Sequence, residues 1–279
     1  MSRVIYTTQG CSRCKIAKQF ISEHNIACKE VDIKKGGLEE FREVYHANPT
    51  SIFKSEKGIE FPVFTDGKEI RQGVGVIVAY LAADRRLDGF IERCHMTHTW
   101  LDGLNISEGD PRHTDKLIKV LNFLKNKGLK LKFNCNGRNS MVLERLLRQG
   151  LGDMAIMSVK GPLVLYSRLA GVEIDSGDIR KSIELIPHFP EFEFFTTLAT
   201  VTLHKGELPR YLTLDEVAGT AELIWNASQS HTHPYTLRAF DPEESSDESV
   251  RSLKKLPDSA LLKYRQAARK FMFRADIEK

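Results

Sequence analysis

The sequence has no long apolar run, little net charge and few cysteines. No segment approaches the ~20 apolar residues that cross a bilayer, and residues 1–6 lead directly into a strand-like run, so we expect no membrane span and no signal peptide. The net charge is only +4, and no basic stripe is interleaved with aromatics, which argues against a nucleic-acid partner. Only one pair among the five cysteines has a motif spacing, as is typical of a protein of the reducing cytoplasm.

The chain is long enough for more than one domain. Its 279 residues, 41% hydrophobic and 28% charged, have the composition of an ordinary globular protein of two domains. Strand-like and helix-like patterns alternate, which predicts the α/β class. We expect a first domain over residues 1–84, a linker helix over 85–101, a second domain over 102–242, and an acidic linker with a basic C-terminal helix over 243–279.

A C-x-x-C motif stands between the first strand and the first helix. The β-rich run 4–8 is broken by Gln9-Gly10, and apolar residues then recur at helical spacing over 16–21. Cys14 therefore opens a helix, and Cys11 lies at its N-terminus. The pattern further predicts a strand over 28–33, a helix over 38–45, a hairpin over 61–71 with an Asp-Gly turn, and a helix over 74–81.

Cys11 and Cys14 are predicted to be a redox-active pair. A thiolate at a helix N-terminus faces unpaired backbone N–H groups and the positive end of the helix dipole, which lowers the pKa of Cys11, and Arg13 adds positive charge. Cys14, one turn into the helix, can attack the mixed disulfide and release the substrate. A structural pair or half of a zinc site is the alternative, but the sequence holds no second C-x-x-C to supply the remaining ligands.

The first domain resembles the glutaredoxins. The resemblance rests on residues 4–7, on the run Cys11-Ser12-Arg13-Cys14-Lys15, and on Phe61-Pro62-Val63-Phe64 followed by glycines at 67 and 73. It implies a thioredoxin fold, a cis Phe61–Pro62 bond opposite the cysteines, and a backbone at Phe61 that meets the bound peptide or glutathione. The predicted substrate-binding residues around the pair are Gly10, Ser12, Arg13, Phe61 and Pro62.

The identity of the reductant depends on the segment 71–75. Glutaredoxins usually carry a Gly-Gly and an acidic cap that hold glutathione, whereas this chain reads Arg-Gln-Gly-Val-Gly. That is closer to the redoxins that serve ribonucleotide reductase and take electrons from thioredoxin reductase. Glutathione and thioredoxin reductase are therefore both candidate reductants, and we expect no firmly bound cofactor.

Cys94, His95 and His98 gather metal-ligating residue types in the expected linker helix. His95 and His98 are spaced to share one helical face. Only these three candidates are local, and no carboxylate pattern completes them. We therefore interpret the cluster as helix surface and predict no metal site.

Beyond the linker, strand-like and helix-like segments alternate. Repeated βα units predict a parallel sheet whose ligands bind at the C-terminal ends of its strands. The expected strands are 103–107, 129–134, 154–159, 192–197 and 235–240, and the expected helices are 116–127, 140–149, 179–186 and 214–227.

The second domain resembles radical-SAM activating enzymes, nearest to the activating proteins of anaerobic ribonucleotide reductase. The resemblance rests on the segments 107–111, 134–137, 158–172, 182–186, 193–197 and 235–240, in order along the chain. It implies a partial (β/α) barrel. The family's C-x-x-x-C-x-x-C loop has no counterpart, its strand-four Asp is Ser158 and its strand-five Arg is Phe195, so we expect neither a [4Fe–4S] cluster nor S-adenosylmethionine.

Polar residues follow several of the predicted strands of the second domain. Because parallel strands end at one edge of a sheet, they predict a polar pocket for a zwitterionic or peptide-like ligand. The alternative is a set of solvated loops left from an ancestral cofactor site. The residues are Glu108, Asp110, Asn136, Arg138 and Lys160.

The two resemblances together favour thiol–disulfide exchange, an electron transfer to or from a specific protein partner held by the second domain. The alternatives are a redox-sensing adaptor and an Fe–S or metal carrier in which Cys11 and glutathione hold a [2Fe–2S] cluster. The basic C-terminal helix is expected to dock on its own domain rather than on a membrane or an acidic partner.

Overall fold

The computed structural model describes residues 3–56, 58–92, 96–203 and 207–279. By packing, the chain divides into two compact units, Met1–Lys132 and Phe133–Lys279. The domain boundaries expected at residues 84, 101 and 242 follow the character of the sequence rather than the packing, and they stay a prediction. No helix among the described residues is long and apolar enough to cross a membrane.

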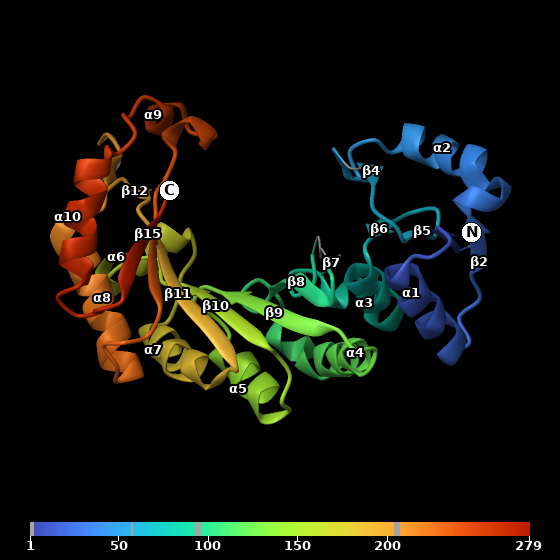
Figure 1. Ribbon diagram of the computed structural model, residues 1–279, viewed down its shortest axis with the longest axis horizontal. Coiled ribbons are helices and arrows are strands. Elements are labelled where there is room, and N and C mark those ends of the chain that lie inside the picture. The colour runs from blue at the N-terminus through green and yellow to red at the C-terminus, as the bar shows by residue number, and fades with distance from the viewer. Residues whose placement is uncertain (1–2, 57, 93–95, 204–206) are drawn as a thin grey trace. The chain divides into compact units, whose positions relative to one another are not determined.

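The first unit begins with a four-stranded sheet in the order β2-β1-β5-β6 (Figure 1). β1 (Val4–Thr7) pairs in parallel with β2 (Lys29–Asp32) and antiparallel with β5 (Val63–Thr65), which pairs antiparallel with β6 (Ile70–Gln72). Every residue of β1 is buried, as expected for the centre of a sheet covered on both faces. The other elements here are α1 (Ser12–Glu23), α2 (Leu38–Ala47), the pair β3 (Lys54–Ser55) and β4 (Gly58–Ile59), and α3 (Val74–Ala83).

Apolar side chains from these strands and helices form a core that includes the second cysteine of the motif. The ring of Phe41 lies 5.2 Å from that of Tyr6 and 5.0 Å from that of Phe61, centroid to centroid. Cys14 belongs to the same buried cluster and is only 2% exposed. The core thus fixes Cys14 and the loop at Phe61 relative to each other.

The rest of the first unit adds a hairpin and a helix. β7 (Met96–Thr97) pairs antiparallel with β8 (Trp100–Asn105), and α4 (Thr114–Asn126) follows. The ring of Phe123 on α4 lies edge-on to Phe20 of α1, with centroids 4.9 Å apart. The first strand and helix of the expected second domain therefore share one compact unit with the N-terminal fold.

The expected linker helix over 85–101 is wrong for the residues described there. α3 ends at Ala83, a single 3-10 turn spans Asp84–Leu87, and the chain is extended from Met96. Gly89 explains the break, because its φ is +87° and a Cβ there would lie 2.4 Å from the carbonyl oxygen of Glu108. Only glycine meets both conditions, and its left-handed backbone does not continue a right-handed helix.

The second unit is built on a parallel sheet in the order β9-β10-β11-β14-β15 (Figure 1). β9 (Lys130–Cys135) spans the boundary between the units; β10 (Met154–Ser158), β11 (Glu191–Thr197), β14 (Tyr235–Arg238) and β15 (Ala275–Glu278) pair in parallel. The helices between them are α5 (Ser140–Arg148), α6 (Leu163–Ala170), α7 (Ser176–Leu185) and α8 (Leu214–Ser228). Each expected strand and helix of this part is present, within a few residues of its expected ends.

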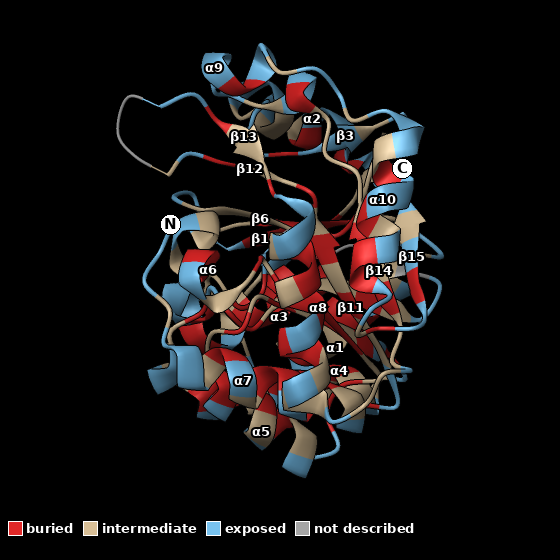
Figure 2. Cartoon of the chain, turned by 90° about the vertical axis from the view of Figure 1, so that its left-hand side faces the viewer, coloured by how far each residue is buried: buried red, intermediate tan, exposed pale blue. Residues whose placement is uncertain are grey.

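Side chains on the two faces of this sheet have different surroundings. In register across three strands, Met157, Phe194 and Tyr235 are buried on one face, and Figure 2 shows the buried residues in red along β11, β14 and α8. On the other face, Phe195 and Arg238 remain partly exposed. Helices therefore cover one face of the sheet, and on the second face Phe195 and Arg238 keep partial contact with solvent.

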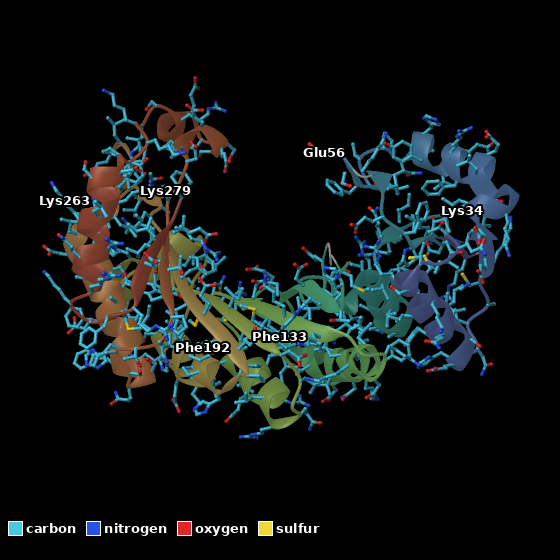
Figure 3. The ribbon with its side chains drawn as sticks, viewed as in Figure 1. Lys34, Glu56, Phe133, Phe192, Lys263 and Lys279 are labelled. Atoms are coloured by element: carbon cyan, nitrogen blue, oxygen red, sulfur yellow. The ribbon has the colours of Figure 1, made fainter. Side chains whose placement is uncertain are left out.

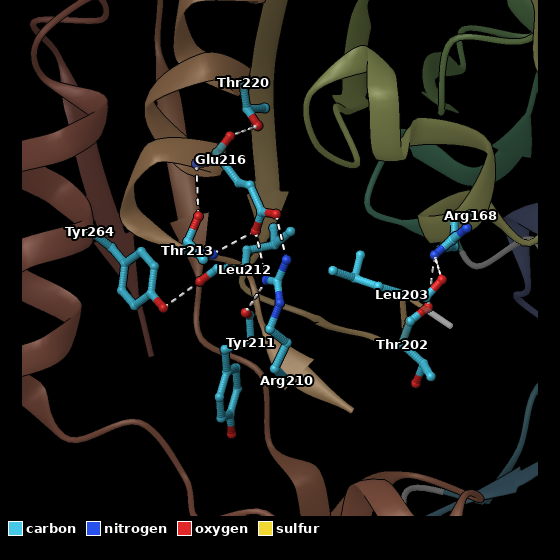
Figure 4. Close-up of polar contacts among 10 residues, drawn as sticks. All are labelled: Arg168, Thr202, Leu203, Arg210, Tyr211, Leu212, Thr213, Glu216, Thr220 and Tyr264. Carbon is cyan, nitrogen blue, oxygen red and sulfur yellow. Dashed lines mark hydrogen bonds and ion pairs between the residues drawn. The ribbon is translucent and has the colours of Figure 1, made fainter. Parts of the chain in front are cut away.

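A small strand pair follows β11 and is anchored by arginines, as Figure 4 shows. β12 (Thr200–Val201) pairs antiparallel with β13 (Arg210–Tyr211). The Arg210 guanidinium donates to both carboxylate oxygens of Glu216, at 2.8 and 2.6 Å, and Glu216 also caps the start of α8. Arg168 of α6 donates to the backbone oxygens of residues 202 and 203, so both ends of this segment are held to the unit.

The C-terminal segment ends in a strand rather than a helix. After the short α9 (Glu248–Arg251), α10 (Asp258–Ala268) packs its apolar face inward, and the Tyr264 hydroxyl donates to the carbonyl oxygen of Leu212 at 2.5 Å. Docking of the basic helix on its own domain is thereby confirmed. After α10 the chain turns and adds β15, a strand that the sequence did not predict, beside β14, with Ala275 opposite Tyr235.

Candidate redox site at the start of α1

The turn before α1 places Cys11 at the helix N-cap. Gly10 has φ +81°, a conformation that glycine adopts without steric cost, and Cys11 follows with an extended backbone. Its sulfur accepts a hydrogen bond from the backbone N–H of Cys14, with 3.3 Å between nitrogen and sulfur. Cys11 thus occupies the capping position that Ser, Thr or Asp usually fills, and its sulfur satisfies an otherwise unpaired donor of the helix.

The two thiols differ strongly in acidity. The pKa of Cys11 falls from 9.0 to about 5, because the side chain and then the backbone N–H of Cys14 donate to its sulfur and Arg13 adds positive charge, against an opposing effect of burial. The pKa of Cys14 is raised, because its thiol donates to Cys11 and is buried. Cys11 is therefore the thiolate at neutral pH, and Cys14 keeps its proton.

The Phe61–Pro62 bond is cis, as the resemblance to glutaredoxins implies, and it lies beside the cysteines. The Cys11 sulfur is 3.7 Å from the carbonyl oxygen of Phe61, to which the protonated thiol can donate. The N–H of Gly73 donates to the carbonyl oxygen of Pro62 at 3.0 Å, which ties this loop to the start of α3. The loop is therefore held from both sides, and the backbone at Phe61 has a fixed position next to the nucleophile.

Two open grooves meet at Cys11 and share the residues 8–12. One has a volume of about 890 Å³ and includes the buried Cys14 together with side chains of α1 and β2. The other has a volume of about 460 Å³ and includes Phe61. The first groove is also lined by Lys15, Lys18, Glu30, Asp32 and Lys35. The second is also lined by Arg13, Lys34, Ile59, Met96 and His98.

The predicted substrate-binding residues lie together at these grooves. Gly10 and Ser12 line both, and Arg13 and Phe61 line the smaller one, with Pro62 buried directly behind. The Arg13 guanidinium also pairs with the carboxylate of Glu60 at 3.1 Å. The positions agree with the prediction, whereas the roles of these residues stay predictions.

Sequence reasoning missed the remaining lining residues. Lys34 and Lys35 directly follow β2, whose C-terminal end lies at the same edge of the sheet as that of β1, and Figure 3 labels Lys34 in this loop. That adjacency could have identified them. Met96 and His98 belong to the β7–β8 hairpin, and nothing in the sequence links them to Cys11.

The residues of the pocket predicted for the second domain fall in both compact units, so the pocket itself stays a prediction. In the first unit, Asp110 accepts the backbone N–H of Arg112 at 3.0 Å and pairs with its guanidinium, which lowers the pKa of the carboxyl to about 2. Glu108 precedes it by two residues. In the second unit, the side-chain oxygen of Asn136 accepts the N–H of Arg138 at 3.4 Å, and Lys160 follows β10.

The sheet face that carries Phe195 and Arg238 holds a paired cation and a buried hydroxyl. The guanidinium of Arg238 lies 3.7 Å over the ring of Phe195 and pairs with Glu278 at 2.6 Å and Glu193 at 3.8 Å. Ser158, opposite Phe195 in the strand register, is 7% exposed, and its hydroxyl has no hydrogen-bond partner among the described residues. Charge on this face is therefore neutralised within the sheet.

The buried Cys135 of the second unit differs from the pair at the start of α1. Cys11 and Cys14 form the pair already described, and Cys135 is buried at the end of β9, where burial raises its pKa to about 12. Among the described residues, no group of three or more His, Cys, Asp and Glu side chains could hold a metal ion. Cys94 and His95 lie outside the described residues, so the interpretation of that cluster is not tested.

Comparison with known proteins assigns the two parts of the chain separately. Residues 4–50 match the family model of glutaredoxin. The N-terminal domain is a glutaredoxin. The chain is 22% identical over 173 residues to a protein of Methanocaldococcus jannaschii named as a glycyl-radical enzyme activating enzyme, covering 61% of this chain and 68% of that protein.

A solved structure is similar to part of the chain. It is a domain of pyruvate-formate lyase-activating enzyme from Bacteroides vulgatus, with a TM-score of 0.43 and 14% identity, covering 63% of this chain and 98% of that one. The predicted order, a glutaredoxin fold followed by a parallel α/β domain similar to radical-SAM activating enzymes, is confirmed.

Proposed function

We propose that the protein is a thiol–disulfide oxidoreductase in which Cys11 attacks and Cys14 resolves. The observation that carries this proposal is the position of Cys11 at the N-cap of α1, where its sulfur accepts the N–H of Cys14 at 3.3 Å. That hydrogen bond favours the thiolate, which is the attacking species. The glutaredoxin assignment of residues 4–50 supports the same chemistry.

The reaction proceeds in two exchanges. The Cys11 thiolate attacks one sulfur of the substrate disulfide, that S–S bond breaks, and the departing thiolate takes a proton from solvent. Cys14 then loses its proton, attacks the Cys11 sulfur of the mixed disulfide and releases the second substrate thiolate. Two electrons have passed to the substrate, and a Cys11–Cys14 disulfide remains for glutathione or thioredoxin reductase to reduce.

Cys14→Ser is the variant that tests this assignment. It should accumulate a mixed disulfide through Cys11, visible by mass mapping, whereas Cys11→Ser should form none. The small substrate 2-hydroxyethyl disulfide, with either glutathione or thioredoxin reductase as electron source, identifies the reductant. Alkylation at neutral pH that labels Cys14 faster than Cys11 would reverse the two roles.

We further propose that the second domain holds a protein partner and performs no S-adenosylmethionine chemistry. The relative named as an activating enzyme supports a partner-binding ancestry, and the described thiols do not fit a cluster. Anaerobic reconstitution with iron and sulfide, followed by dithionite and S-adenosylmethionine, should yield no 5′-deoxyadenosine above a buffer control. Production of it would refute this part of the proposal.

The partner is expected to carry a thiol or disulfide, in a reducing compartment such as the cytoplasm, where a dithiol of this kind persists. Capture from extract on the Cys14→Ser protein, released by dithiothreitol, gives its identity. The same capture by a variant that also lacks Cys11 is the background to subtract.

A further inference from the structure

Part of the redox site comes from outside the glutaredoxin fold. Met96, in β7, and His98, in the turn between β7 and β8, line the 460 Å³ groove together with Cys11, Arg13 and Phe61. All of these residues belong to the same compact unit. Thiol exchange needs only the cysteines and the loop at Pro62. The β7–β8 hairpin therefore has no role in the chemistry proposed above.

The smaller groove is positively charged. None of the described residues that line it is acidic, and Lys34 and His98 have no ion-pair partner among the described residues. The third cation, Arg13, is compensated by Glu60 at 3.1 Å. Lys34 and the imidazole of His98, when protonated, therefore supply a net positive potential beside Cys11.

The larger groove is also lined by more basic than acidic side chains. It is lined by Lys15, Lys18 and Lys35 against Glu30 and Asp32. Lys18 is already paired with Glu30 at 2.8 Å, while neither Lys15 nor Lys35 forms an ion pair within the described part of the chain. Basic groups thus exceed acidic ones in both grooves, and they also offset the repulsion between the Cys11 thiolate and an anionic substrate.

The arrangement of the grooves favours a polypeptide over a small thiol. Both grooves contain the residues 8–12, so a chain can run from one to the other across Cys11. Ile59, Phe61 and Met96 give the smaller groove an apolar part, and the flexible thioether of methionine adapts to different side chains. Such a surface fits residues on both sides of a substrate cysteine.

We propose that the β7–β8 hairpin is a substrate-specificity element of the redox site, and that the two grooves take a cysteine-bearing polypeptide segment rich in Asp and Glu. This inference rests on the proposed thiol–disulfide exchange and names the substrate class of that site. Met96 supplies an apolar contact, and Lys34 and His98 supply the cationic ones.

The test uses four disulfides. Two are neutral 2-hydroxyethyl disulfide and glutathione disulfide. The other two are synthetic peptides in which a single cysteine forms a mixed disulfide with 2-mercaptoethanol, one flanked by Asp and Glu and the other by Lys. At low salt, kcat/KM should be about tenfold higher for the acidic peptide than for the basic one, and the contrast should shrink as salt rises. Lys34→Glu and His98→Glu should each reduce this contrast about threefold or more. Lys68→Glu, an exposed lysine in the β5–β6 turn, is the matched control and should leave it unchanged.

The outcomes separate the two proposals. If the unmodified protein does not reduce 2-hydroxyethyl disulfide, the proposed function itself is contradicted. Normal activity on it, with equal rates for both peptides, overturns only the inference about the grooves. The inference also fails if Lys34→Glu and His98→Glu change the rate with glutathione disulfide but not with the acidic peptide, since the grooves then serve a small anion. Unchanged rates on 2-hydroxyethyl disulfide show that each variant is folded.

Discussion

Cys11 in the first unit and Cys135 in the second are the same chemical group in opposite settings. Cys11 is partly exposed at a helix N-cap, and its pKa falls to about 5. Cys135 is buried at the end of β9, and its pKa rises to about 12. The difference shows that reactivity in this protein follows from backbone N–H groups and solvent access, since the residue type is common to both places.

The two arginines of the sites extend this contrast. Arg13 stands next to a thiolate and helps to lower its pKa, although Glu60 shares it. Arg238 lies over Phe195 and is neutralised by two carboxylates of its own sheet. In the first unit a cation acts on a reactive group, whereas in the second the charges satisfy one another.

Exchange of each cysteine for serine should break the comparison most directly. Cys11→Ser should lower the rate of disulfide reduction by more than ~10³-fold, because no other described thiol is both exposed and acidic. Cys135→Ser should leave that rate unchanged and cost about 1–3 kcal/mol of stability, because a hydroxyl replaces a sulfur in a buried position. Reduction of 2-hydroxyethyl disulfide and chemical denaturation measure the two effects. A large loss of activity in Cys135→Ser would contradict the contrast.

The pH dependence of alkylation sharpens the same contrast. Cys11, with a pKa of about 5, should react with iodoacetamide at a rate that is constant above neutral pH and falls as the pH drops through 5. Burial raises the pKa of Cys28 to about 11. At pH 7 Cys28 should react at least about tenfold more slowly than Cys11, because its far smaller thiolate fraction outweighs its greater intrinsic nucleophilicity. Cys135 should stay unlabelled until the protein is unfolded. Mass mapping of quenched samples follows each site.

The features predicted correctly are those that a short stretch of sequence determines. The C-x-x-C motif after a strand predicts a helix that begins at the cysteines, which is observed. The cis Phe61–Pro62 bond, which is also observed, was implied by the resemblance to glutaredoxins. The order of strands and helices in the second unit follows from periodicity for the same reason. Local patterns are sufficient here because each element is specified within its own residues.

The features that were missed depend on contacts between distant segments. In place of the helix expected over 85–101, Ile91 bridges to Leu104 and Met96–Thr97 pair with β8, and the backbone at Gly89 passes close to Glu108; no local pattern reveals these contacts. β15 is four residues long with alternating polar positions, and only its pairing with β14 makes it a strand. Met96 and His98 reach the redox site through the path of the hairpin in space.

Substitution of Gly89 tests how firmly that tertiary contact fixes the junction. Gly89→Ala should cost about 2–4 kcal/mol, because the left-handed backbone is unfavourable for alanine and the new Cβ meets the Glu108 carbonyl. Gly128→Ala is the control: its φ is similar, at +82°, but a Cβ there meets nothing within 4 Å, so about 1 kcal/mol is expected. In a Trp225→Phe background, the fluorescence of Trp100 reports the first unit. Equal losses in the two variants would mean that the Glu108 contact contributes nothing.

Two buried serines of the second unit provide the smallest and most specific comparison. Ser182 is fully buried and donates to the carbonyl oxygen of Gly137 at 3.2 Å, so Ser182→Ala should cost about 1 kcal/mol by leaving that oxygen unpaired. Ser158 is almost as buried, yet its hydroxyl has no partner among the described residues. Ser158→Ala should therefore change stability by less than ~0.5 kcal/mol or increase it, because a desolvated hydroxyl is removed.

The Ser158→Ala substitution tests whether the buried Ser158 hydroxyl is a structural contact. The Ser158 hydroxyl lies opposite Phe195 in the strand register, is buried and has no partner among the described residues, so its removal measures the cost of a desolvated hydroxyl alone. Denaturation followed by the fluorescence of Trp225, in a Trp100→Phe background, reports the second unit alone. If Ser158→Ala destabilised that unit as much as Ser182→Ala, its hydroxyl would be a structural contact. The second unit would then resemble a scaffold whose charges and hydroxyls are all internally satisfied.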